Sequence, residues 1–221
     1  MEFRGDSSMV EHQLHQADDG GSSPTSPLQV QEITLKEAKP FILKWHYSHV
    51  VPTGKNIFFG WFQEDTLYAV ADYGVGVNPY QAAFLNRTIG TVVVTSKTLV
   101  ELKRLCRSEP RRESDPLTRF LKVCHLLLRK RGYAGVVSFS DPEQGHSGGI
   151  YKAANFTHLG TTNSKWHVVG ADGVKRHRRY PYRYAKRNGV DMKTARDELG
   201  LVRVQTKPKD RWFLNIAKPS R

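Results

Sequence analysis

The amino-acid sequence predicts a single α/β domain, in which helices flank a central mixed sheet, with a basic C-terminal extension. Two observations carry this prediction. Apolar runs of strand length alternate with helical patterns, in the order strand, helix, hairpin, central strand, helix, strand, helix, strand. Residues 174–221 hold fifteen Lys and Arg but four Asp and Glu, so they carry eleven of the thirteen net positive charges.

Length and composition narrow the class of protein. At 221 residues the chain can bury the core of one full domain. Residues 1–28 are polar and lack periodicity, so we expect a disordered tail before a domain of residues 29–173. We find no apolar run of about 18 residues and no secretory signal. Cys106 and Cys124 lie in apolar patterns typical of buried free thiols, so we expect a cytoplasmic protein without a membrane partner.

The first half of the domain predicts a strand, a helix and a hairpin. Residues 28–33 have strand character, and Thr34 followed by Glu37 has the spacing of a capping box at the start of a helix. The apolar runs Ile57–Gln63 and Leu67–Tyr73 are joined by a short turn, which is typical of a hairpin.

The next strong strand candidate is Leu99–Cys106, which would lie in the centre of the sheet. A shorter candidate, Thr91–Thr95, precedes it. Strict alternation places four side chains of the central strand on one face: Val100, Leu102, Arg104 and Cys106. An arginine among apolar side chains needs a carboxylate or phosphate partner, unless it reaches solvent from the strand end, and the sequence leaves both readings open.

A basic loop, residues 107–114, leads from this strand into a helix with apolar residues at helical spacing. This arrangement predicts an anion site, because free amide donors and the helix dipole attract negative charge. For Ser114 the alternative is simple N-capping of the helix. The expected cofactor-binding residues are Arg104, Arg111, Arg112 and Ser114.

Polar residues also gather after the strand Gly135–Ser140. A glycine-containing polar turn leads from Asp141 to a short helix, Ile150–Asn155. In open α/β sheets this edge is where ligands bind. Asp141 and Tyr151 are therefore candidates for chemistry, with a cap of the Asp-Pro turn and aromatic packing on the sheet as their structural alternatives.

The remainder of the chain predicts strands, a helix and a final basic hairpin. The strand candidates are Phe156–Thr162 and Lys165–Gly170, the helix is Met192–Leu199, and the hairpin joins Leu201–Thr206 to Arg211–Ile216. Because aromatic side chains stand among the positive charges, this segment favours a nucleic-acid partner.

Four blocks of this sequence resemble Mom DNA-modification proteins of the phage Mu type, which belong to the GNAT-like acyltransferases. The blocks are Lys44–Ser48, Leu102–Leu105, Ser138–Asp141 and Gln144–Phe156. The resemblance implies a GNAT-like fold with coenzyme A pyrophosphate held after the central strand. It also implies a phage-encoded enzyme that converts adenine in DNA to N6-carbamoylmethyladenine and protects DNA from restriction in the host cytoplasm.

The resemblance leaves the donor open. Residues 107–114 lack the glycine-rich loop of ordinary acetyltransferases. Acyl transfer forms an amide, whereas a carbamoylmethyl group is attached through a CH2. Either an acyl adduct rearranges, with acetyl-coenzyme A as one candidate donor and a metal ion such as iron as a helper, or a glycine-derived group is inserted. His46, Asp141 and His146 offer nitrogen and oxygen ligands, although their spacing is no local metal motif.

With the resemblance, the helix-end residues His46 and Tyr47 become the first candidates for chemistry. His46 would deprotonate adenine N6 or bind a metal, and its structural alternative is a helix C-cap. The target base must leave the duplex stack, with Trp45, Trp61 or Tyr73 as candidates to stack on it. The expected catalytic residues are His46, Tyr47, Asp141 and Tyr151.

Two other functions stay open at this point. One is a GNAT-type N-acyltransferase acting on a small amine, a protein or an aminoacyl group. The other is a non-catalytic nucleic-acid-binding protein.

Overall fold

The computed structural model describes residues 29–63, 65–76, 78–91, 93–108, 117–176 and 178–218. The chain divides into two compact units, which are described separately. Unit 1 is the chain up to Ser138 together with Leu214–Arg221, and unit 2 is Phe139–Phe213. The predicted domain boundary at Val174 is a different division, and it stays a prediction.

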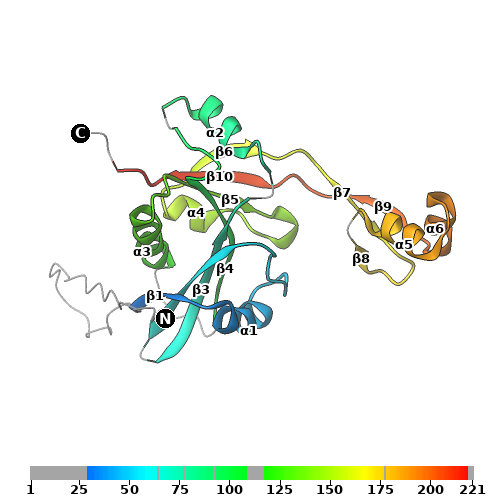
Figure 1. Cartoon of the computed structure of the whole chain (residues 1–221), viewed down its shortest axis with the longest axis horizontal. Coiled ribbons are helices and arrows are strands. Elements are labelled where there is room, and N and C mark those ends of the chain that lie inside the picture. The colour runs from blue at the N-terminus through cyan, green and yellow to red at the C-terminus, as the bar shows by residue number, and fades with distance from the viewer. Residues whose placement is uncertain are drawn as a thin grey trace, which may run out of the picture. The chain divides into compact units, whose positions relative to one another are not determined.

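The fold is α/β with a mixed seven-stranded sheet flanked by helices, as predicted, and it has a second, three-stranded sheet (Figure 1). In unit 1 five strands follow one another in sequence order across the sheet, and β4 and β5 form the parallel pair. They are β1 (Gln29–Ile33), β2 (Asn56–Gln63), β3 (Thr66–Gly74), β4 (Leu99–Arg107) and β5 (Gly135–Ser140). The predicted hairpin is β2–β3, which pair antiparallel.

Helices α1 and α3 cover opposite faces of the sheet in unit 1. Ile42 of α1 belongs to the same buried cluster as Val70, whereas His125 of α3 meets the ring of Tyr73 edge-on. Val70 and Tyr73 are three residues apart on β3, so their side chains face opposite sides. The helices of unit 1 are α1 (Leu35–Trp45), α2 (Gln81–Ile89) and α3 (Leu117–Lys130). Of the helices in the described ranges, none is long and apolar enough to cross a membrane.

The predicted capping box starts α1. The backbone amide of Glu37 donates to the Thr34 hydroxyl at 3.3 Å, and the Thr34 amide donates to the Glu37 carboxylate at 2.7 Å. Two helix-end amides are thereby satisfied by side chains only three residues apart. The start of α1 is therefore fixed by local sequence.

Strand β4 departs from strict alternation in its middle. Its register with β3 pairs Tyr73 with Leu102 but Asp72 with Arg104, so Lys103 is an extra residue in a β-bulge. Because Asp72 and Tyr73 face opposite sides of the sheet, Leu102 and Arg104 also do, and the predicted common face is wrong. The bulge instead brings Lys103 and Arg104 to the face that carries Asp72.

The segment between β3 and β4 contains a helix that the sequence did not predict. Helix α2 begins after Tyr80 without a side-chain cap, which removes the usual sequence signal. The candidate strand at 91–95 is wrong, because residue 91 and residues 93–95 form no strand. The Asn86 side chain bonds both the amide and the carbonyl of Val94, each at 2.8 Å, and so takes the place of a neighbouring strand.

Unit 2 contains two strand systems. The predicted final hairpin is wrong, because β9 pairs with β7 while β10 pairs with β6. The sequence also missed α5, whose pattern is dominated by Tyr, Lys and Arg. The strands are β6 (Thr157–Thr161), β7 (Trp166–Val169), β8 (Lys175–Arg176), β9 (Val202–Gln205) and β10 (Asp210–Asn215). The helices are the 3-10 turn η1 (Pro142–Gln144), α4 (Gly149–Ala153), α5 (Tyr180–Asn188) and α6 (Met192–Glu198).

Both cysteines are buried free thiols, as expected. Burial raises the pKa of the Cys106 thiol to about 12 and holds the pKa of Cys124 well above its usual value. A thiol that stays protonated is a poor nucleophile. The chemistry of this protein is therefore to be sought in other side chains.

Candidate functional site

His46 lies in the turn that ends α1 and is only 6% exposed. Its Nδ1 accepts the backbone amide of Ser48 at 3.1 Å and lies 2.8 Å from the Ser48 hydroxyl. A nitrogen that accepts an amide proton cannot itself carry one, so the neutral ring bears its proton on Nε2. In this tautomer Nε2 is a hydrogen-bond donor, which suits stabilisation of negative charge better than removal of a proton.

Tyr47 lies beside His46 and is more exposed to solvent than His46. Its ring centroid lies 4.3 Å from that of His46, and 43% of the residue is exposed.

Two of the residues proposed to stack on a target base are in the core: Trp61 is 9% exposed and Tyr73 is fully buried. Those two assignments are wrong, since a buried ring has no face to offer a base. Trp45 is half-buried, with the Lys44 ammonium over its ring.

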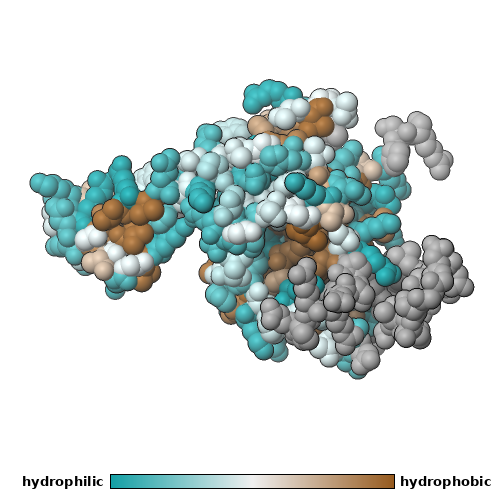
Figure 2. All heavy atoms as spheres, turned by 180° about the vertical axis from the view of Figure 1, so that it is seen from behind, coloured by the Kyte–Doolittle hydropathy of each residue, from teal (hydrophilic) through white to brown (hydrophobic). Residues whose placement is uncertain are grey.

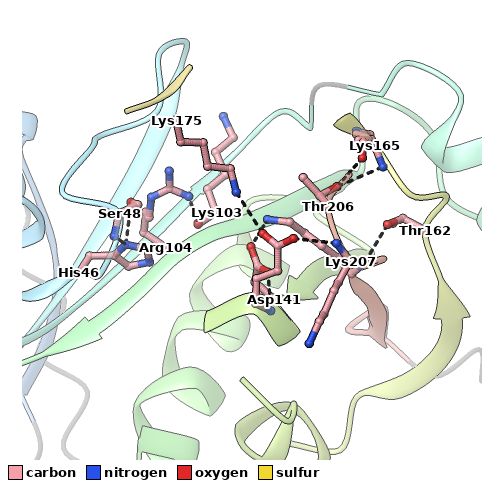
Figure 3. A network of polar contacts seen from close by, with 12 residues as sticks. His46, Ser48, Lys103, Arg104, Asp141, Thr162, Lys165, Lys175, Thr206 and Lys207 are labelled. Carbon is pink, nitrogen blue, oxygen red and sulfur yellow. Dashed lines mark hydrogen bonds and ion pairs between the residues drawn. The ribbon is translucent and has the colours of Figure 1, made fainter. Parts of the chain in front are cut away.

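Arg104 ties the loop after α1 to the middle of β4. Its Nε donates to the Val50 carbonyl at 3.1 Å, and Nη1 donates to the Lys103 carbonyl at 2.6 Å. Figure 3 draws Arg104 together with His46 and Ser48, and all these residues belong to unit 1. The side chain is half-buried and lies across from a carboxylate, Asp72, on the neighbouring strand. The structure thus brings together three of the predicted site residues, His46, Tyr47 and Arg104.

Asp72 is the residue of this neighbourhood that sequence reasoning missed. It is fully buried in β3, and burial raises the pKa of its carboxyl to about 7. Asn56 on β2 and Lys103 on the bulge lie on the same face, with Lys103 Nζ donating to Asn56 Oδ1 at 3.0 Å. The signal in the sequence is a charged residue within an otherwise apolar strand.

A small cavity opens where β3 ends and β4 begins. Its volume is about 50 Å³, and its polar wall includes Gln81 and Glu101. Gln81 is 5% exposed, and its Nε2 has no hydrogen-bond partner among the described residues. A Cβ at Gly76 would come within 2.7 Å of Glu101 Oε2, so glycine leaves the room for that carboxylate. The cavity accommodates groups of the size of a few water molecules.

The predicted phosphate-binding residues Arg111, Arg112 and Ser114 lie outside the described residues. Their role, and with it the binding of a phosphate-bearing donor after β4, stays a prediction.

In unit 2, Asp141 makes the contacts of its structural alternative. Its Oδ1 accepts the Glu143 amide at 3.1 Å and caps η1, and its Oδ2 lies 2.6 Å from Lys209 Nζ. Glu143 accepts the amide of Lys207 at 2.7 Å and pairs with Lys175 at 3.0 Å (Figure 3). The Lys207 amide, and then Lys175, lower the pKa of the Glu143 carboxyl. These carboxylates fasten the turn after β5 to the basic part of unit 2, and a chemical role of Asp141 stays a prediction.

Tyr151 also makes the contacts of its structural alternative. Its ring stacks on Trp212 at 5.7 Å between centroids and meets Phe156 edge-on at 5.4 Å. The indole of Trp212 is 2% exposed and donates to the Ser140 hydroxyl at 2.9 Å. Tyr151 thus covers the buried centre of unit 2, and its role as an acid stays a prediction.

Gly148 allows this aromatic cluster to close. Its φ is 75°, and an added Cβ would overlap the Trp212 ring, whereas Gly145 has a φ of 72° with open space around it. We expect Gly145→Ala to cost about 1 kcal/mol through backbone strain. Gly148→Ala should lower the free energy of unfolding by several kcal/mol, because it adds overpacking to the same strain. Urea unfolding of both variants measures the difference, and equal losses would show that the Trp212 contact contributes nothing.

The predicted histidine–carboxylate metal set does not assemble as a cluster in the described ranges. Among these residues there is no group of three or more His, Cys, Asp or Glu side chains that could hold a metal ion. His46 is in unit 1, whereas Asp141 and His146 are in unit 2. That residues of the two units line one cleft stays a prediction.

The exposed side of α5 is basic. Pro181 and Ala185 are buried and turn toward the rest of unit 2. Four of its exposed residues follow at i, i+1, i+4 and i+5, which is one side of a helix: Tyr182, Arg183, Lys186 and Arg187. Hydrophilic residues cover most of the face of the molecule seen in Figure 2, and hydrophobic residues gather there in separate patches.

Other cations of unit 2 are engaged within the unit itself. Arg176 pairs with Asp172 and lies over the ring of Tyr180, and Arg203 lies 4.5 Å from the centroid of Trp166. Such side chains serve the fold. The α5 cations are therefore the better candidates for an external partner.

The Methylcarbamoylase mom of Escherichia phage Mu is 28% identical over 149 residues, which are 66% of this chain and 58% of that relative. The chain thus spans less than two thirds of the length of the curated relative it matches. The ribosomal-protein-S18-alanine N-acetyltransferase of Escherichia coli is 12% identical with a TM-score of 0.48, covering 87% of this chain and 96% of that chain. An acetyltransferase of Bacillus subtilis in complex with CoA is 10% identical with a TM-score of 0.46, covering 85% and 98%. The model of the Mom protein family matches residues 27–219, and the chain therefore belongs to the Mom protein family.

Proposed function

We propose that this protein is a DNA-modifying transferase that converts adenine in DNA to N6-carbamoylmethyladenine and so protects phage DNA from restriction in the host cytoplasm. The observation that carries the proposal is the match of the Mom family model to most of the chain. The similarity to a phage protein named as a methylcarbamoylase supports transfer of a methylcarbamoyl group.

The unit 1 cluster supplies groups for this chemistry. The exocyclic amine of adenine is a weak nucleophile, and charge develops on the donor as the new bond forms. His46, with its proton on Nε2, donates a hydrogen bond to that charge, and the cationic Arg104, which holds the loop after the His46 turn, adds electrostatic stabilisation. A glycine-derived donor would supply the CH2–C(=O)–N unit directly, whereas an acyl-coenzyme A would supply only an acyl group, which must then rearrange and gain a nitrogen. The loop expected to hold the donor lies outside the described residues.

The basic face of α5 supplies the grip on DNA. Arg183, Lys186 and Arg187 project from one side of a helix, so they can contact successive phosphates of a backbone. Tyr182, which is 59% exposed, offers a ring for stacking beside them. Phosphate contacts of this kind hold DNA without reading its sequence, which leaves the choice of adenine to the chemical site.

Restriction digestion tests the proposal. Plasmid DNA from cells that express the full chain should resist enzymes whose sites contain adenine, while DNA from cells with the empty vector should be cut. DNA that is cut equally in both cases would contradict the proposed function. Protection that survives loss of His46 would contradict the placement of the chemistry in unit 1.

A further inference from the structure

A carboxylate sits at the centre of the polar face of unit 1, where burial makes it unfavourable. Asp72 is 0% exposed, and its Oδ1 has no hydrogen-bond partner among the described residues. Within the described part of the chain, its Oδ2 accepts a long bond of 3.4 Å from Asn56. A carboxylate that is removed from water without full compensation destabilises the fold. Such a group is retained where it serves function more often than where it serves stability alone.

The β-bulge places two cationic residues on the face of the sheet that carries Asp72. The extra residue in β4 turns Lys103 to the face on which Arg104 already lies. A Cβ added at Gly74 would lie 2.7 Å from Lys103 Nζ. Because Gly74 has no Cβ, there is room for the Lys103 ammonium over β3. The charged groups that act on Asp72 are Lys103, Arg104 and Glu101 of β4, and Asp72 in turn acts on the Cys106 thiol of the same strand.

These side chains form a frame that holds the loop after α1. Asn56 donates to the Pro52 carbonyl at 2.9 Å as well as to Asp72. Arg104 donates to the Val50 carbonyl at 3.1 Å. Two points of the loop are thus held by two side chains, and Asp72 lies between those side chains on the middle strand. The turn with His46 and Ser48 directly precedes these two anchor points.

We propose that Asp72 is a positioning residue that fixes the His46–Ser48 turn through Asn56 and through the bulge cations Lys103 and Arg104. Asp72 lies directly opposite Arg104 in the register of β3 and β4 and accepts a hydrogen bond from Asn56, and these two side chains hold Val50 and Pro52. The functional meaning of the proposal rests on the proposed function, in which His46 acts on the reacting groups. The positioning itself is a property of unit 1 and does not depend on DNA or donor.

The titration of Asp72 gives the proposal a signature in stability. Because its folded-state pKa, about 7, lies above the unfolded value, the stability associated with this group is fully present below about pH 4. It is lost as the pH rises through about 7. Asp72→Asn removes this loss, so the melting temperature of the variant minus that of the wild type should be larger at about pH 8 than at about pH 5.

Hydrogen exchange in the full chain tests the positioning. The Ser48 amide donates to His46 Nδ1, and the His49 amide donates to the His46 carbonyl at 2.9 Å. In Asp72→Asn we expect these two amides to exchange at least about tenfold faster, while the Ala38 amide within α1 keeps its rate. Asp65 is an exposed carboxylate on the turn of the same hairpin, so Asp65→Asn is the matched control. This variant should leave the exchange rates of the Ser48 and His49 amides unchanged.

Two results would overturn the proposal: unchanged exchange at Ser48 and His49, or an equal acceleration at every protected amide, which would indicate a general structural role.

Adenine modification in cells is the second readout. The Asp72→Asn variant should modify adenine at least about tenfold less than the wild type, although the melting temperature of the variant at about pH 8 is not lowered. If the wild-type protein modifies no adenine, the proposed function fails, while the exchange rates still decide whether Asp72 positions the turn.

Discussion

Neutralising the exposed face of α5, in a variant with Arg183→Gln, Lys186→Gln and Arg187→Gln, should lower the affinity for duplex DNA at least about tenfold at low salt. Each lysine or arginine that neutralises a phosphate releases counterions, and this release makes binding salt-dependent. Loss of three such contacts should lower the slope of log affinity against log salt by about 2 to 3. Fluorescence anisotropy of a labelled duplex between about 50 and 200 mM salt measures both quantities.

A charge-matched control separates the α5 face from net charge. Lys36→Gln, Lys39→Gln and Lys122→Gln remove the same three charges from exposed positions on α1 and α3. Long-range attraction to DNA would fall equally in both triple variants, whereas direct phosphate contacts would be lost in the α5 variant only. Equal affinities and equal slopes for the two variants would contradict the assignment of α5 as the DNA contact.

Replacing His46 should remove adenine modification and leave DNA binding intact. We expect His46→Ala to reduce the modified fraction at least about a hundredfold, which is the usual contribution of a positioned hydrogen-bonding or proton-transfer group. His46→Gln is the sharper test, because a glutamine amide can donate from a place close to that of Nε2. Since Nδ1 is occupied by the Ser48 amide, we expect Gln to retain clearly more modification than Ala.

His49→Asn is the control for this pair. His49 lies on the same turn with a φ of 47°, a conformation that asparagine tolerates, and its ring contacts the Leu43 carbonyl at 2.7 Å. The His49→Asn variant should modify adenine at the wild-type level. If His46→Gln is as inactive as His46→Ala while all variants bind DNA, His46 acts as a base from the other tautomer and the donor assignment is wrong.

The elements that the sequence predicted are those fixed by nearby residues. The Thr34–Glu37 capping box, the apolar face of α3 and the hairpin β2–β3 all depend on residues a few positions apart. The faces of β4 could not be predicted, because the bulge at Lys103 exists only in the register between β3 and β4. The pairing of β9 with β7 was missed for the same reason, since it joins strands about forty residues apart.

The candidate site was predicted in part, and the missing part is again non-local. His46, Tyr47 and Arg104 were found and lie in one neighbourhood of unit 1. Asp72 was missed because a carboxylate in a strand gains its meaning from the cations on the next strand. For Asp141 and Tyr151, the sequence alone could not choose between chemistry and structure, and their contacts with Lys209 and Trp212 match the structural alternatives.

The mass of the adenine nucleosides in DNA from cells that express this chain tests the central claim most directly. We predict a deoxyadenosine that carries a carbamoylmethyl group on N6 in the wild-type sample and its loss in the His46→Ala sample. DNA whose nucleosides are all unmodified, although the wild-type protein is folded and abundant, would contradict the claim.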